Sequence, residues 1–179
     1  MTTLDALRDQ IPDYAKDLKL NLGSVLAPTG APGLTERQIW MVAVATAIAS
    51  RDVQFAHRIE DLSRATLDEA AVTAAKAAAA IMGMNNTYSR FTYLVEDAEY
   101  RTLPARLRMN VIGNAGIDKV DFELISLAVS AVNGCGMCVN AHDAVLKKHG
   151  VARDAIQSGV RIGSVVHAVA GVVAYEAAG

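Results

Sequence analysis

The sequence predicts an all-α protein, and three observations support that fold class. Apolar residues recur at helical spacing along most of the 179-residue chain, whereas the period-two alternation of half-buried strands is nearly absent. Cap residues followed by Glu or Gln precede several of the apolar runs. Hydrophobic residues make up 52% of the chain, which supplies a sizeable core and is not the composition of a disordered protein. The length fits one domain, residues 1–179, or two small similar halves that share a core.

Charge and hydropathy narrow the classes of partner. The net charge of −2 and the absence of a long basic run argue against nucleic acid or an anionic membrane as the main partner. The first 14 residues lack the basic region and apolar stretch of a signal peptide. The alanine-rich runs 42–49 and 70–84 are interrupted by polar residues and fall short of the roughly 20 apolar residues of a membrane helix. We therefore expect a soluble, cytoplasmic protein.

The N-terminal elements follow from cap and turn residues. Thr3 or Thr2 can cap a first short helix. Pro12 suits the first turn of a second helix, residues 13–26, because its missing N–H has no helical partner to lose there. Residues 27–34, with two prolines and two glycines, predict a loop.

Two capping boxes are predicted in the middle of the chain. Thr35, followed by Glu and Gln, opens a strongly apolar helix that runs through Ala49. Residues 50–52 then break the chain before a further helix. Thr66 and Glu69 have the spacing of a second capping box, which leads into a long alanine-rich helix.

The C-terminal part begins with an irregular segment. Residues 101–119 contain one proline and two glycines as breakers, and two or three helices follow. Gly150 is predicted as a helix C-cap, and Asp154 lies near the start of the last helix.

The chain also shows a possible internal sequence repeat. A shift of 85 residues aligns two halves without a gap, approximately residues 36–90 and 121–175. We therefore predict two similar all-helical halves, a pseudo-repeat, although alanine-rich helices also match by composition alone. In this alignment Ser50 and Val53 stand where the second half has its two cysteines, which indicates that the fold does not require the thiols.

The two cysteines, Cys135 and Cys138, form a CxxC motif. A purely structural disulfide is a poor explanation, because the cytosol is reducing and so short a loop removes little entropy from the unfolded chain. A structural zinc site is also poorly supported, since only His142 joins the cysteines locally and zinc needs four ligands. Redox chemistry is the favoured interpretation, with chance burial of two small side chains as the alternative.

A base and a carboxylate accompany the motif. An Asn-Gly stop precedes Cys135, which places this cysteine at a helix N-terminus, where free N–H groups and the helix dipole stabilise a thiolate. Cys138 and His142 are four residues apart, so they share a helix face and the imidazole can take the thiol proton directly or through one water. Glu123 lies on an apolar face of the preceding helix, and a helix hairpin could bring His142 to it as a partner.

Taken singly, each of these residues has a non-catalytic explanation: His142 could be an ordinary helix residue, and Glu123 could be a solvent-facing acid. Together they have the spacing E-x11-C-x2-C-x3-H and the carboxylate, base and nucleophile logic of a catalytic triad. We interpret the other three histidines as structural.

Several segments resemble one known family. PDYAKDLKLNL, AAIMGMNN, LRMNVIGNAGIDKVDFEL and SAVNGCGMCVNAH are similar to the alkyl hydroperoxide reductase D (AhpD) family of the carboxymuconolactone decarboxylase-like superfamily. The resemblance implies an all-helical AhpD-like subunit of two similar halves that assembles into homo-oligomers, commonly trimers. It implies an antioxidant peroxidase that reduces organic hydroperoxides and also reduces an AhpC-type peroxiredoxin. Electrons would come from dihydrolipoamide on a lipoyl-bearing 2-oxoacid dehydrogenase component, with no cofactor or metal bound to the chain itself.

The resemblance also implies residue roles. Cys138 would become the sulfenic acid, and Cys135 would be the resolving thiol and proton donor that closes a Cys135–Cys138 disulfide. His142 would be the base, and Glu123 the carboxylate that orients it and relays protons. Met137 departs from the pattern, because better-known members carry a histidine between the cysteines and a thioether relays no proton.

Two other functions stay open at this point. A carboxymuconolactone decarboxylase-like lyase on the same fold would use His and Glu for proton transfer and would have no need of two cysteines. A non-catalytic helical oligomer would use the cysteine pair as a redox-sensing disulfide.

Overall fold

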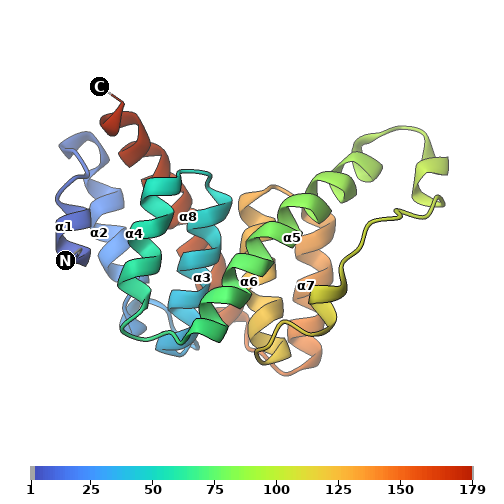
Figure 1. Ribbon diagram of the computed structural model, residues 1–179, viewed down its shortest axis with the longest axis horizontal. Coiled ribbons are helices and arrows are strands. Elements are labelled where there is room, and N and C mark those ends of the chain that lie inside the picture. Colours follow the sequence, from blue (N-terminus) through green and yellow to red (C-terminus); the bar gives the residue numbers. More distant parts are fainter. Residues whose placement is uncertain (1–2, 179) are drawn as a thin grey trace.

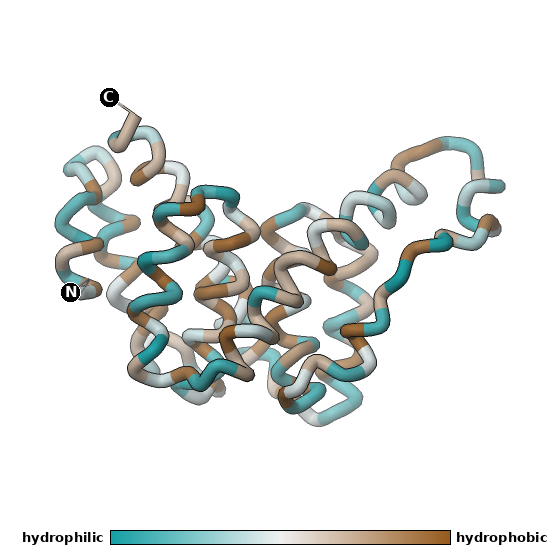
Figure 2. Tube along the Cα trace, in the orientation of Figure 1, coloured by the Kyte–Doolittle hydropathy of each residue, from teal (hydrophilic) through white to brown (hydrophobic). Residues whose placement is uncertain are grey.

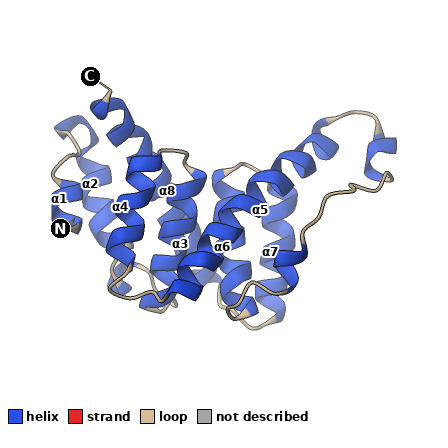
Figure 3. Cartoon of the chain, in the orientation of Figure 1, coloured by secondary structure: helices blue, strands red, loops and turns tan. Residues whose placement is uncertain are grey.

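The computed structural model describes residues 3–178, which form eight α-helices, four short 3₁₀ turns and no strand (Figure 3). The helices are α1 (Leu4–Arg8), α2 (Lys16–Val25), α3 (Glu36–Ala49), α4 (Val53–Ser63), α5 (Glu69–Leu94), α6 (Lys119–Val132), α7 (Gly136–Lys148) and α8 (Arg153–Ala177). The 3₁₀ turns are Asp13–Ala15, Pro28–Gly30, Ala98–Arg101 and Asn110–Gly113. The predicted all-α class is confirmed.

Helices α3 and α6 form the centre of the molecule (Figure 1). Every residue from Met41 to Ala47 on α3 and from Phe122 to Ser130 on α6 is buried. Helix α3 packs against α4, α5, α6 and α8, and α6 packs against α5, α7 and α8. A helix that is covered on all sides must be apolar all round, which explains why these two segments show no polar face. A carboxylate on α6 therefore needs a partner from a neighbouring helix.

Helix α8 is the most apolar of the long helices. Among residues 3–178 it alone has the length and mean hydropathy of a membrane span, and half of its most apolar window is buried inside the protein. It packs against α2, α3 and α6. A Cβ at Gly159 would lie 3.0 Å from Leu124, and one at Gly163 would lie 3.1 Å from Thr46, so both glycines permit close approach to α6 and α3. The hydropathy of α8 is accounted for by this packing in the core.

Four predicted helix caps can be compared with the structure: three are confirmed and one is wrong. Thr3 accepts a hydrogen bond from the N–H of Ala6, and Thr35 forms a complete capping box with Gln38. Gly150, at φ +79°, directly follows the α7 C-cap His149 and ends the helix, as predicted for a glycine at this end. Thr66 does not cap α5. The N-cap is Asp68, because the chain first makes a tight turn in which Ser63 accepts from two backbone N–H groups.

The corrected capping predicts a contrast between two identical substitutions. Thr35→Ala should destabilise the fold by about 1 kcal/mol, because it removes the acceptor of the capping box on α3. Thr66→Ala should stay within about 0.5 kcal/mol of wild type, because this threonine caps no helix. Urea unfolding followed by circular dichroism measures both, and equal losses would contradict the assignment.

The same succession of helices occurs twice. Helices α3, α4 and α5 have 14, 11 and 26 residues, and α6, α7 and α8 have 14, 13 and 25. The turn between the first two helices of each set contains a residue in the left-handed region, Arg51 at φ 67° and Gly134 at φ 70°. These two positions are 83 residues apart, two fewer than the shift used in the sequence alignment. That the two halves repeat in three dimensions stays a prediction.

The two turns also resemble each other in their helix caps. The side chains of Asp52 and Cys135 each accept a hydrogen bond from the N–H three residues on, at the start of a helix. The sequence alignment instead pairs Cys135 with Ser50.

The C-terminal end of α5 and the segment after it project away from the helical body (Figure 1). We call residues 91–109 the arm. Figure 2 shows brown, hydrophobic stretches along it. Its exposed large hydrophobic side chains are Phe91, Tyr93, Leu94, Tyr100, Leu103 and Leu107. Most of residues 101–119 is irregular, as predicted, with one 3₁₀ turn before α6 begins at Lys119.

Candidate redox site

A tight helical hairpin carries the two cysteines. Helix α6 ends at Val132, Asn133 is its C-cap, and Gly134 adopts φ 70°, a conformation that glycine reaches without steric cost. The N–H of Cys135 then donates to the carbonyl of Ser130 at 3.0 Å, and α7 begins at the next residue. Cys135 is therefore the N-cap of α7, as the sequence predicted.

The sulfurs of Cys135 and Cys138 are joined in a disulfide, with their Cα atoms 5.3 Å apart. The N–H of Cys138 donates to the sulfur of Cys135 at 3.3 Å. Both residues are buried, with exposed fractions of 2% and 4%. The pair thus lies within the first turn of a 13-residue helix, where the backbone N–H groups and the helix dipole favour a negative charge on sulfur.

The hairpin also brings Glu123 and His142 together. The Nδ1 atom of His142 lies 2.6 Å from Oε2 of Glu123, and both residues are more than nine-tenths buried. A carboxylate can only accept, so Nδ1 carries the proton in this bond. The Nε2 atom of the neutral ring is then the free basic position.

The structure therefore places the four predicted residues as two pairs on one hairpin. His142 follows Cys138 by one turn of α7 and shares its face. Within residues 3–178 no hydrogen bond joins the imidazole to either sulfur while the disulfide is closed. Chemically, the arrangement offers a reducible disulfide with an oriented base one helical turn away.

Helix α5 supports the hairpin through hydrogen bonds from two residues that the sequence analysis missed. The Asn86 amide donates to the hydroxyl of Ser130 at 2.9 Å and accepts from the Asn133 amide at 3.0 Å. Arg90 donates to the Asn133 carbonyl at 2.7 Å. Asn86 is almost fully buried, so its satisfied amide fixes the turn that carries Cys135. A polar residue on the buried face of an alanine-rich helix was the signal that could have identified it.

One face of the cysteine hairpin borders a cavity. Met137, between the two cysteines, is 47% exposed. It lines a cavity of about 380 Å³ with residues of α5 and the arm, including Tyr88, Tyr93, Tyr100 and Arg101. The cavity reaches the motif at Met137, and neither cysteine belongs to its lining.

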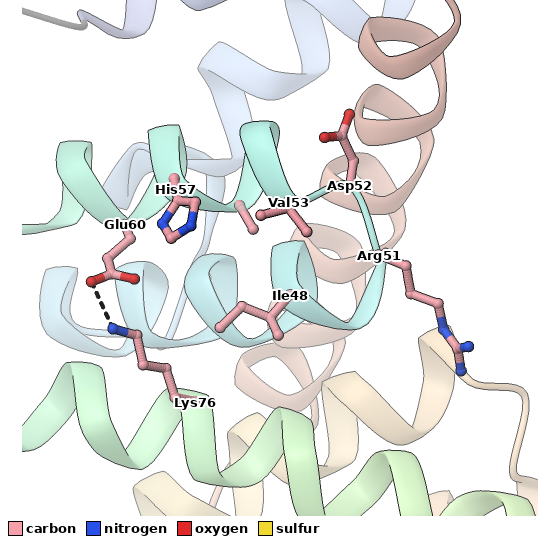
Figure 4. A pocket seen from close by; sticks show the side chains of 8 residues that line it. Ile48, Arg51, Asp52, Val53, His57, Glu60 and Lys76 are labelled. Carbon is pink, nitrogen blue, oxygen red and sulfur yellow. Dashed lines mark hydrogen bonds and ion pairs between the residues drawn. The ribbon is translucent and has the colours of Figure 1, made fainter.

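A separate cavity of about 190 Å³ lies in the first half of the chain, between α4 and α5 (Figure 4). Its walls include Ile48, Val53 and His57, and the Glu60–Lys76 ion pair closes one end. None of the lining residues is a cysteine, so this cavity offers no thiol chemistry.

Glu60 is the most buried carboxylate outside the hairpin. Burial by itself raises the pKa of this carboxyl, but hydrogen bonds from Lys76 at 2.8 Å and Arg64 at 2.7 Å outweigh burial and hold the pKa below its ordinary value. A lowered pKa in the folded state makes a contribution to stability that is present above the unfolded pKa. That contribution is lost as the pH falls through the folded pKa.

Glu60→Gln should therefore change how stability depends on pH. The difference in unfolding free energy between wild type and this variant should be largest above about pH 5 and should shrink as the pH falls below about 4.3, the ordinary glutamate pKa. Urea unfolding at a series of pH values measures the difference. A difference that stays constant across the series would show that the charge of Glu60 does not stabilise the fold.

No three His, Cys, Asp or Glu side chains are arranged to hold a metal ion in the part of the chain that the structure describes. His142 pairs with Glu123, and the two cysteines pair with each other.

Comparison with known proteins finds one matching family model and several similar proteins that share one name. The family model described as carboxymuconolactone decarboxylase matches residues 98–178, which include the whole hairpin. An alkyl hydroperoxide reductase AhpD from Hyphomonas neptunium is 55% identical over 98% of this chain and 96% of its own length. Proteins of the same name from Streptomyces griseus, 55% identical over 93% of this chain and 92% of their own length, and Coxiella burnetii, 52% identical over 97% and 98%, are also similar.

These relatives match the chain nearly from end to end, and the matched family model covers the α6–α7 hairpin with its cysteine pair and its Glu–His pair. The chain therefore belongs to the alkyl hydroperoxide reductase AhpD family.

Proposed function

We propose that this chain is an antioxidant thiol peroxidase that reduces organic hydroperoxides, with Cys138 and Cys135 as its redox pair. The observation that carries the proposal is a buried Cys135–Cys138 disulfide on the same hairpin as the buried Glu123–His142 pair. The names of the similar proteins support the same activity.

The first step oxidises Cys138. His142 takes the thiol proton at Nε2, directly or through one water, while Glu123 holds Nδ1–H and stabilises the imidazolium. The thiolate attacks the terminal peroxide oxygen, the O–O bond breaks, and the alkoxide takes the proton of the Cys135 thiol and leaves as the alcohol. Cys138 becomes a sulfenic acid.

The second step closes the disulfide. The Cys135 thiolate attacks the sulfenic sulfur of Cys138, the S–O bond breaks, and the departing hydroxide takes the proton of the His142 imidazolium and leaves as water. In the closed disulfide the two Cα atoms are 5.3 Å apart, within the usual range for such a bond. Fast capture protects Cys138 from irreversible oxidation.

The third step restores the thiols. The two cysteine residues are at most 4% exposed, which favours a slender dithiol over a bulky protein thiol as reductant. We propose dihydrolipoamide on a 2-oxoacid dehydrogenase component as this donor, and an AhpC-type peroxiredoxin as a second partner. Two successive thiol–disulfide exchanges transfer the electrons without a bound cofactor. We also propose a cytoplasmic homo-oligomer, a trimer.

Peroxide consumption by the purified protein tests the proposal. With dihydrolipoamide, cumene hydroperoxide should be consumed catalytically, and mass spectrometry after a peroxide pulse should trap the Cys138 sulfenic acid and then the disulfide. A disulfide that forms without catalytic consumption would favour a sensor or a pure disulfide reductase. Activity on a lactone acid in the double Cys→Ser protein would favour the lyase.

Met137 offers a test of the proton network. Met137→His should raise peroxide turnover severalfold, because a histidine on this half-exposed side chain position can donate and relay protons that a thioether cannot. Met137→Leu is the matched control and should leave turnover unchanged. Dihydrolipoamide-dependent peroxide consumption across a pH series measures both. Equal rates in the two variants would show that no donor at position 137 assists the reaction.

A further inference from the structure

A third pocket, of about 240 Å³ and open to solvent, lies behind the α6–α7 turn, between the α3–α4 turn, α5 and α8. Its charged and polar lining consists of Arg51, Arg90, His167, Ser50, Thr87 and Asn133. No carboxylate belongs to this lining. We infer that the cavity binds an oxyanion, a phosphate or carboxylate group, and this inference does not rest on the peroxidase proposal.

Arg51 is the residue whose presence most needs an explanation. It occupies a left-handed turn position, φ 67°, where glycine or asparagine is favoured and where the corresponding turn of the second half has Gly134. Within residues 3–178 its guanidinium makes no ion pair and no side-chain hydrogen bond. Figure 4 shows the side chain directed away from His57, Glu60 and Lys76. The guanidinium of Arg51 is therefore available to bind a ligand.

Arg90 supplies a second guanidinium that is already held in place. Its Nη1 donates to the Asn133 carbonyl at 2.7 Å, and no described carboxylate neutralises it. A guanidinium fixed by one hydrogen bond loses less entropy when its other N–H groups bind a ligand. Two arginines facing one cavity match the paired oxygens of phosphate or carboxylate.

The two hydroxyl groups in the lining donate their hydrogen bonds to backbone carbonyls. Ser50 donates to the Thr46 carbonyl at 2.7 Å, and Thr87 donates to the Gly83 carbonyl at 2.8 Å. Nδ1 of His167 lies 3.1 Å from Oγ of Ser50, so it is the donor in that bond. The Nε2 atom of this ring makes no hydrogen bond within residues 3–178.

The size of the cavity agrees with this class of ligand. About 240 Å³ exceeds the roughly 30 Å³ share of one water several times over and leaves room for a tetrahedral oxyanion. Because Arg90 and Asn133 belong both to this cavity and to the support of the Cys135 turn, an occupant places a negative charge beside that turn.

Isothermal titration with inorganic phosphate, and separately with acetate, at constant ionic strength tests the inference. Wild type should bind at least one of the two saturably, and the comparison identifies which oxyanion the cavity prefers. Arg51→Gln should weaken binding about tenfold or more, because one charge-assisted contact is lost. Arg51→Gly should weaken it equally while removing the left-handed backbone constraint, which keeps the test independent of folding strain.

Arg106→Gln is the matched control. Arg106 also has a left-handed backbone, φ 51°, and lies exposed on the arm outside the cavity, so its loss removes the same charge without touching the site. Binding should be unchanged in this variant. Equal weakening in the Arg51 and Arg106 variants, or no saturable binding by wild type, would overturn the inference.

Discussion

Cys138→Ser should abolish catalytic peroxide turnover, because a serine hydroxyl at neutral pH is far less nucleophilic than a thiolate and cannot form a sulfenic acid. We expect a loss of roughly 10³-fold or more, as when an enzyme loses its nucleophile. Cys135→Ser should also stop turnover, but in a different way. Cys138 should still consume one equivalent of peroxide and then accumulate as sulfenic acid, because no thiol remains to resolve it.

The two variants are distinguished by a single-turnover experiment. Peroxide loss and trapping of sulfenic acid are measured after one peroxide pulse without dithiol, and then with dihydrolipoamide. The chain has two cysteines in total, so each single variant leaves one thiol and the trapped residue is unambiguous. Undiminished turnover in both variants would refute the thiol mechanism. Sulfenic acid on Cys135 in the Cys138→Ser protein would show that the roles are reversed.

Glu123→Gln should separate catalysis from folding. The amide keeps an oxygen that can accept the hydrogen bond from Nδ1 of His142, so the loss of stability should be small. It carries no charge to stabilise the imidazolium that forms when the ring takes the thiol proton, so activity should fall about 10²–10⁴-fold.

His142→Leu, unlike Glu123→Gln, should strongly reduce the stability of the fold. It leaves the Glu123 carboxylate buried without a partner, which should destabilise the fold by about 3–5 kcal/mol in addition to removing the base. Urea unfolding and peroxide consumption on the same preparations measure both effects. Wild-type activity in Glu123→Gln would assign the pair a purely structural role.

The hairpin is the part of the site that the sequence predicted well, because its determinants are local. The Asn-Gly stop places Cys135 at a helix N-terminus, and the four-residue spacing places His142 over Cys138. A buried acid on an apolar helix predicted a partner, and the adjoining helix supplied one in His142.

The residues that the sequence analysis missed depend on contacts between distant segments. Asn86 reaches Ser130 across 44 positions in sequence, and a polar residue within an alanine-rich helix does not by itself identify its partner on another helix. Asp68 replaced Thr66 as a cap because the preceding turn consumes two more residues than the capping pattern assumed. The arm and the cavity at Arg51 were not predicted, since both depend on where α5 ends relative to the hairpin.

Cys135 holds the first turn of α7 through its sulfur, which accepts from the Cys138 N–H. In the oxidised protein that same sulfur is bonded to Cys138, so a covalent bond and a hydrogen bond close one turn of helix. Reduction removes the covalent bond, and the amide of Cys138 should therefore exchange its hydrogen faster in the reduced protein. Hydrogen exchange at this one backbone amide thus reports whether the cysteine pair is oxidised or reduced.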